Sequence, residues 1–216
     1  MENDRLFILI VLSSVFIGML TISNVLAFKL VEFTTLLIAP AGVFAYAITY
    51  PMTDTMVEIF GKDRVKFIVL IGILTQLLVL GVIQLSVILP SASFFQYQSE
   101  FALVLSQSSR IIFASLVAYL FSQLWDITIF SWTKKKTKGK YLWLRNNLST
   151  ISSQLLDSTL FVVIAFYGMM SISELVMLII GQYLVKVIIA LIDTPIVYML
   201  VYIIRNKFDI GEEIEI

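Results

Sequence analysis

Apolar residues along this chain gather into six long runs, and short polar stretches separate them. A helix needs about 20 consecutive apolar residues to cross a hydrocarbon core roughly 30 Å thick, and each run is long enough. The pattern therefore predicts an all-α polytopic membrane protein, a bundle of six transmembrane helices that forms one transmembrane domain over residues 1–216. The predicted helices cover residues 6–28, 36–60, 65–89, 110–132, 148–170 and 175–204.

Composition supports this fold class and narrows the range of functions. Hydrophobic residues make up 59% of the 216 residues and charged residues only 14%, too few polar groups to cover a water-soluble surface. The absence of Cys and His excludes disulfides, thiolate nucleophiles, Ser-His triads and HExxH zinc sites. Fifteen basic residues balance fifteen acidic ones, which indicates no nucleic-acid partner. We expect no enzyme activity, no cofactor and no metal site.

Basic residues are distributed unevenly between the two sides of the predicted bundle. With the N-terminus inside, the cytoplasmic connections hold most of the Lys and Arg residues, including the run KKKTKGK at 134–140, and the outer side holds Lys29 and Arg110. Because Lys and Arg favour cytoplasmic loops, both termini of this multi-pass protein are predicted to be cytoplasmic. The KKKTKGK run is interpreted as a topology anchor that also contacts anionic lipid.

Two outer connections have unusual patterns. FKLVEFTTLLIAPAG at 28–42 places Pro and Gly ahead of the second run, which predicts a broken helix near 34–42 or a short re-entrant piece covered by protein. The stretch LPSASFFQYQSEFALVLSQSSR at 89–110 is aromatic and amphipathic. It predicts an interfacial helix at the outer headgroups or a lid over a cavity.

Polar residues recur on one face of several predicted helices. A helix turns about 100° per residue, so Tyr50, Asp54 and Glu58 line up along the second helix. The fourth and fifth helices carry nearly the same nonamer, SQLWDITIF at 122–130 and SQLLDSTLF at 153–161. Each copy places Gln and Asp on one face with a Phe one turn beyond the Asp. Intramembrane polar groups cost a few kcal/mol each, so these faces are expected to line the bundle interior or a wet cavity.

The Gln-x-x-Asp faces suit a planar heterocycle. Gln offers a donor and an acceptor, an ionised Asp offers acceptors, and Phe offers a flat surface for stacking. The alternative is that Gln and Asp only join helices, with the repeated nonamer a chance likeness or a vestige of duplication. Acids outnumber bases within the spans, so Lys186 is expected to pair with one of the acids, and the cavity to favour a cationic or donor-rich ligand unless some acids are protonated.

Several segments together resemble a known family. The segments, in chain order, are SNVLAFK, YPMTDTMVEIFG, AYLFSQLWD, WLRNNLSTISSQLLDSTLFVVIAFYG and YLVKVIIALIDTPIVY. They resemble the queuosine-precursor transporters, also called the vitamin-uptake transporter family, and the likeness runs from about Asn24 to Tyr198. One mild departure is Phe60, where the family is expected to have Tyr before the Gly.

The resemblance implies a six-helix inner-membrane carrier that imports 7-deazaguanine bases, the precursors of queuosine and archaeosine, through a polar midplane site. Combined with the helical faces, it predicts the substrate-binding residues Asn24, Asp54, Glu58, Gln123, Asp126, Asn146, Asn147, Gln154, Asp157 and Phe161. It also predicts the charge-partner or gating residues Lys29, Arg145, Lys186 and Asp193.

The sequence is also compatible with other functions. A membrane substrate-binding subunit of an energy-coupling vitamin importer would have a similar size and number of helices. An intramembrane enzyme with paired Asp would need a GxGD signature or closely spaced Asp repeats, which the sequence lacks. The expected partners are the small-molecule base and the lipid bilayer, and a homodimer is left open.

Overall fold

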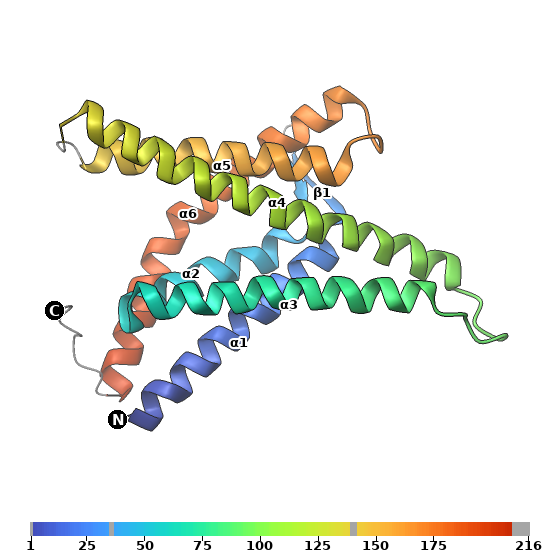
Figure 1. Cartoon of the computed structure of the whole chain (residues 1–216), viewed down its shortest axis with the longest axis horizontal. Coiled ribbons are helices and arrows are strands. Elements are labelled where there is room, and N and C mark those ends of the chain that lie inside the picture. Colours follow the sequence, from blue (N-terminus) through green and yellow to red (C-terminus); the bar gives the residue numbers. More distant parts are fainter. Residues whose placement is uncertain (1, 35–36, 139–141, 209–216) are drawn as a thin grey trace.

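A computed structural model of the chain describes residues 2–34, 37–138 and 142–208, which form six helices and two short strands. The elements are α1 Glu2–Leu26, β1 Leu30–Thr34, β2 Leu37–Pro40, α2 Val43–Phe60, α3 Lys62–Ile88, α4 Gln98–Lys136, α5 Leu142–Phe166 and α6 Ile172–Phe208 (Figure 1). The predicted all-α polytopic membrane fold is confirmed.

Five of the described helices, α1, α3, α4, α5 and α6, are long and apolar enough to cross a membrane. Most residues of their apolar stretches lie on the outside of the bundle, as Leu78 at 71% exposed and Ile88 at 76% illustrate. An apolar exterior of this extent suits lipid rather than water. The shorter α2 has 18 residues and includes Asp54 and Glu58, so its composition alone does not mark it as a span.

The two ends of the described chain lie at the same end of the bundle. Ile8 and Leu12 of α1 share an apolar core with Val201 and Ile204 of α6, and Figure 1 shows these helix ends converging. An even number of membrane crossings gives such an arrangement, and α2 is the sixth helix available for it. The cytoplasmic placement of this end stays a prediction.

A β-hairpin stands where a broken helix was expected near 34–42. Strands β1 and β2 pair antiparallel, with Leu30 opposite Pro40 and Glu32 opposite Ile38, and α2 begins only at Val43. The apolar segment around Ile38 is therefore a strand and not the start of a helix. Pairing between the two strands satisfies its backbone hydrogen bonds, as helix formation would. The hairpin packs against α6.

Helix α4 is longer than its apolar run predicted. It begins at Gln98 and continues for 39 residues, which at about 1.5 Å per residue is roughly twice the thickness of the hydrocarbon core. The expected interfacial helix or lid at 89–110 is therefore wrong for residues 98–110, which continue directly into a membrane helix. Helices α4 and α5 then run side by side (Figure 1).

The buried apolar side chains form two separate clusters. One joins α1, α2, α3 and α6 and includes Phe16, Met56 and Ile68. The other joins α4, α5 and the first part of α6 and includes Phe161 and Leu178. Packing in two clusters leaves the space between them for polar groups, and the candidate site lies there.

Candidate functional site

A cavity of about 360 Å³ lies between the two apolar clusters. Its wall draws on Phe16 of one cluster and Phe161 of the other, and every helix contributes to it. One lining residue from each helix, in chain order, is Asn24, Tyr46, Gln76, Tyr119, Asp157 and Lys186. Polar side chains from every helix thus meet around one partly open space.

A buried ion pair forms one wall of the cavity. Lys186 Nζ on α6 donates to Asp157 Oδ2 on α5, with the two side chains 7% and 18% exposed. Ser122 Oγ on α4 lies 3.4 Å from the other Asp157 oxygen, and Lys186 Nζ lies 5.7 Å from the centre of the Tyr46 ring. Since a buried charge is tolerated only with a partner, each member of the pair holds the other in place.

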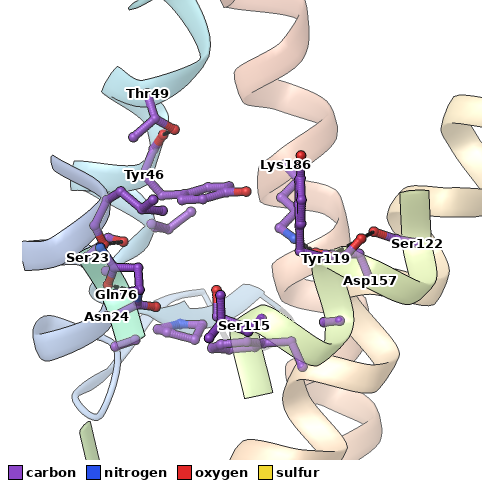
Figure 2. A pocket seen from close by; sticks show the side chains of 18 of the residues that line it. Ser23, Asn24, Tyr46, Thr49, Gln76, Ser115, Tyr119, Ser122, Asp157 and Lys186 are labelled. Carbon is purple, nitrogen blue, oxygen red and sulfur yellow. Dashed lines mark hydrogen bonds and ion pairs between the residues drawn. The ribbon is translucent and has the colours of Figure 1, made fainter. Parts of the chain in front are cut away.

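A chain of hydrogen bonds forms the opposite wall. Asn24 Nδ2 on α1 donates to Gln76 Oε1 on α3 at 3.0 Å, and Gln76 Nε2 donates to Thr21 Oγ1 at 2.8 Å. Figure 2 shows Asn24 and Gln76 on one side of the cavity and Asp157 and Lys186 on the other. The amide wall is internally satisfied, so its role within the structure is to join α1 to α3 and to fix the direction of the two amides.

Two glutamines in the cavity wall have acceptors without partners. Gln154 Oε1 on α5 and Gln182 Oε1 on α6 are buried and make no hydrogen bond, although both residues line the cavity. Gln182 is only 6% exposed. A buried carbonyl oxygen left without a partner costs about 1–3 kcal/mol, so a rotation of either amide toward the cavity would allow it to accept a hydrogen bond from a molecule there.

Aromatic rings supply the remaining chemistry of the cavity. Tyr46 and Tyr50 of α2 pack edge to face with their ring centres 5.2 Å apart. Tyr46 extends from α2 toward the side of the cavity that holds Tyr119 and Lys186 (Figure 2). Phe161 lines the cavity and packs edge to face on Phe166 behind it. Flat rings beside donors and acceptors are the groups that bind planar heterocycles.

The structure brings together a third of the residues that were predicted for the site and leaves others apart. The cavity-lining members are Asn24, Gln154, Asp157, Phe161 and Lys186. They come from α1, α5 and α6, so residues far apart in the sequence meet in one place.

The acids of α2 lie outside the cavity wall. Asp54 and Glu58 are both exposed, and Glu58 accepts a hydrogen bond from Arg205 of α6 at 3.2 Å. Tyr50, which shares their helical stripe, does line the cavity. The stripe therefore runs from the cavity toward the end of α2, and only its first member reaches the space. Lys29, between α1 and β1, is also exposed and away from the lining.

The structure describes the backbone but not the side chains at six other predicted positions. Four of these positions were assigned to substrate binding and two to charge pairing. The side chains of Gln123, Asp126, Arg145, Asn146, Asn147 and Asp193 all lie outside the described part of the chain.

Sequence reasoning missed several residues of the wall. Gln76 was overlooked because a single amide in an apolar run is usually explained as helix-to-helix contact. The signal available was its place in the middle of IGILTQLLVL, where no other residue but Thr75 is polar. Tyr46 and Ser115 also line the cavity. Within the described residues, no group of three or more acidic side chains is placed to hold a metal ion.

Comparisons with known proteins match most of the chain. The profile of the family described as "putative vitamin uptake transporter" matches residues 40–200. A protein of Bacillus subtilis (strain 168) named "probable queuosine precursor transporter" is 30% identical over 194 residues, which cover 89% of this chain and 84% of that protein. No solved structure matches.

Proposed function

The chain belongs to the vitamin uptake transporter family, and from that premise we propose that it imports queuosine or archaeosine precursors, the 7-deazaguanine bases, across the cell inner membrane. The similar Bacillus subtilis protein is named as a probable transporter of queuosine precursors. The route in our proposal is the cavity between the two apolar clusters, which acts as a midplane site open alternately to either side.

The cavity is the observation that supports this function best. Its volume of about 360 Å³ is near the lower end of the range of about 300–1,000 Å³ for small-molecule sites, which suits a bicyclic base. A 7-deazaguanine presents N1–H and an exocyclic amine as adjacent donors, and Gln154 and Gln182 offer two acceptors without partners. Tyr46 and Phe161 offer rings for its faces.

The two walls of the cavity suit a carrier mechanism. The amide wall belongs to α1 and α3 and the ion-pair wall to α5 and α6, so a bound base would contact both groups of helices. A small shift of one group against the other would change the side to which the base is exposed. In our proposal Gln123 and Asp126 of α4, which repeat the Gln154 face, complete the base site.

Replacing Asp157 tests this assignment. Asp157→Asn should abolish uptake of a labelled 7-deazaguanine base by cells that express the protein. The matched control is Asp63→Asn at the start of α3, an acid that is 95% exposed and remote from the cavity. This control should transport as the unaltered protein does. Full uptake by correctly inserted Asp157→Asn protein would remove Asp157 from the site.

A double variant separates the site from the fold, because Asp157→Asn also breaks the ion pair. Asp157→Asn combined with Lys186→Met removes both charges and should insert normally. Loss of uptake in the inserted double variant reports on the site itself. Normal uptake by the double variant would show that neither charge is needed for transport.

A further inference from the structure

The amide wall satisfies its buried groups internally, and one of its oxygens keeps accessible surface. Asn24 donates through Nδ2 to Gln76 Oε1, and among the described residues no group donates to its carbonyl oxygen, Oδ1. Asn24 Oδ1 is not one of the fully buried oxygens without a partner, whereas Gln154 Oε1 and Gln182 Oε1 are. Because Asn24 is only 5% exposed and lines the cavity, the accessible surface of Oδ1 faces that space.

The direction of the hydrogen bonds is set at the far end of the wall, behind the cavity. Thr21 Oγ1 lies 2.9 Å from the carbonyl oxygen of Ile17, one turn earlier in α1. A carbonyl oxygen can only accept, so Thr21 donates its single hydroxyl proton there. The Thr21 oxygen is left as an acceptor, and Gln76 meets it with its amine, Nε2, at 2.8 Å.

This direction passes through both amides to the cavity. An amide carries its amine and its carbonyl on opposite arms, so Gln76 presents Oε1 to Asn24 when Nε2 faces Thr21. Asn24 must answer that oxygen with its own amine, which turns Oδ1 away from Gln76. With both amides rotated by half a turn, Gln76 Oε1 would face a Thr21 oxygen whose proton is already donated to Ile17. The wall therefore presents an acceptor to the cavity and not a donor.

On the basis of the transport function proposed above, we infer that Thr21 and Gln76 are positioning residues that fix Asn24 Oδ1 as the acceptor for an N–H group of the bound base. Thr21 is not among the described residues that line the cavity, so it acts through Gln76 without touching the base. A 7-deazaguanine carries N–H donors at N1, at N9 and on the exocyclic amine. An acceptor of fixed direction stabilises such a base, and an amine in the same place would oppose it.

Removing the Thr21 hydroxyl tests the positioning role. Thr21→Val keeps the shape of the side chain and lets the Gln76 amide rotate, so that Nε2 can donate to Asn24 Oδ1 and occupy it. If about a fifth of the molecules keep the acceptor free, KM for uptake of a labelled 7-deazaguanine base rises about fivefold while the maximal rate per inserted protein stays unchanged. Thr21→Ser keeps the hydroxyl and should restore KM.

Thr75→Val on α3 is the matched control for the lost hydroxyl. Thr75 Oγ1 makes the same bond to the carbonyl oxygen four residues earlier, that of Ile71, at 2.8 Å. Thr75 is not among the described residues of the cavity wall, although it is next to Gln76 in the chain. This variant should take up the base with unchanged KM.

Analogues of the base separate positioning from a purely structural role. Three analogues each lack one N–H donor: one has no exocyclic amine, one is methylated at N1 and one at N9. Binding is read as thermal stabilisation of the purified protein. Loss of the donor that meets Asn24 should weaken binding by about tenfold in the unaltered protein and leave it unchanged in Asn24→Ala. A structural role alone would weaken binding of the base and of all three analogues by the same factor.

The outcomes distinguish the inference from the transport function. An unchanged KM in Thr21→Val, or an equal rise in Thr21→Ser, would overturn the positioning role. Gln76→Met, which removes the amide at similar length, should raise KM likewise and is the second variant if Thr21→Val does not insert. Equal losses for every analogue in Asn24→Ala and in the unaltered protein would remove Asn24 from contact with the base. Failure of the unaltered protein to bind or take up any 7-deazaguanine would refute the transport function and the inference with it.

Discussion

Removing one member of the buried ion pair should destabilise the protein strongly. Lys186→Met keeps most of the length of the side chain and removes only the charge, which leaves the Asp157 carboxylate buried without its partner. Because the pair links α5 to α6, the loss also removes one of the contacts between two helices that line the cavity.

The expected loss follows from the burial of the pair. Two unit charges 4 Å apart interact by about 4 kcal/mol at an effective dielectric constant of about 20. Removing one member of a buried pair typically costs about 3–5 kcal/mol. Asp157 is 18% exposed and retains some contact with solvent, so we expect about 3 kcal/mol. For a chain of this size that corresponds to a lowering of the melting temperature by about 6–12 °C.

The assay is thermal unfolding of the purified protein in lipid nanodiscs. Lys186→Met should melt well below the unaltered protein, and the double variant Asp157→Asn with Lys186→Met should recover most of the loss because no unpaired charge remains. Glu58→Gln provides a matched control at an exposed pair, where the side chain of Glu58 is 57% exposed. Such a pair is worth about 0–1 kcal/mol, so the control should lose little.

Two outcomes would refute this reasoning. If Lys186→Met melts at the temperature of the unaltered protein, the ion pair does not hold α5 and α6 together. If the double variant is as unstable as Lys186→Met alone, the loss comes from packing around the side chain and not from an unpaired charge.

Two further substitutions test the packing around the cavity. Gly181→Ala would place a Cβ atom 2.1 Å from the carbonyl oxygen of Ile38, so the hairpin must move and stability should fall by about 1–3 kcal/mol. The control is Gly18→Ala, whose added Cβ atom has no atom within 4 Å and which should be neutral. Equal melting temperatures of the two variants would contradict the close approach. Gln76→Leu removes the centre of the amide wall and should lower the free energy of unfolding by about 1–3 kcal/mol. Gln84→Leu, at an exposed position of the same helix, is the control. Equal effects of the two substitutions would show that the hydrogen bonds of the amide wall add nothing to stability.

The helices were predictable and the hairpin was not. An apolar run of about 20 residues almost always forms a membrane-spanning helix. The helices were therefore predicted correctly, and only their first and last residues differ in the structure. The hairpin depends on a contact distant in sequence: Gly181 of α6 lets the backbone of Ile38 approach closely. No local pattern around 28–42 carries that information.

The candidate site was predictable in part, for a related reason. Helical periodicity correctly places residues on a face, so Gln154, Asp157 and Phe161 share the cavity. Periodicity does not tell at which level along a helix the cavity lies. Asp54 and Glu58 share the helical face of Tyr50 but lie beyond the end of the cavity. The repeated nonamer has a consequence in the packing of α4 on α5, where Ser122 of the first copy meets Asp157 of the second.

Uptake by the isolated protein tests the central claim most directly. The purified chain is reconstituted into vesicles without other proteins, and uptake of a labelled 7-deazaguanine base is followed with guanine as competitor. The account predicts saturable uptake that guanine does not block and that Asp157→Asn abolishes. Absence of uptake in vesicles with verified insertion would contradict it, and uptake restored only by a partner ATPase would identify the chain as a binding subunit instead.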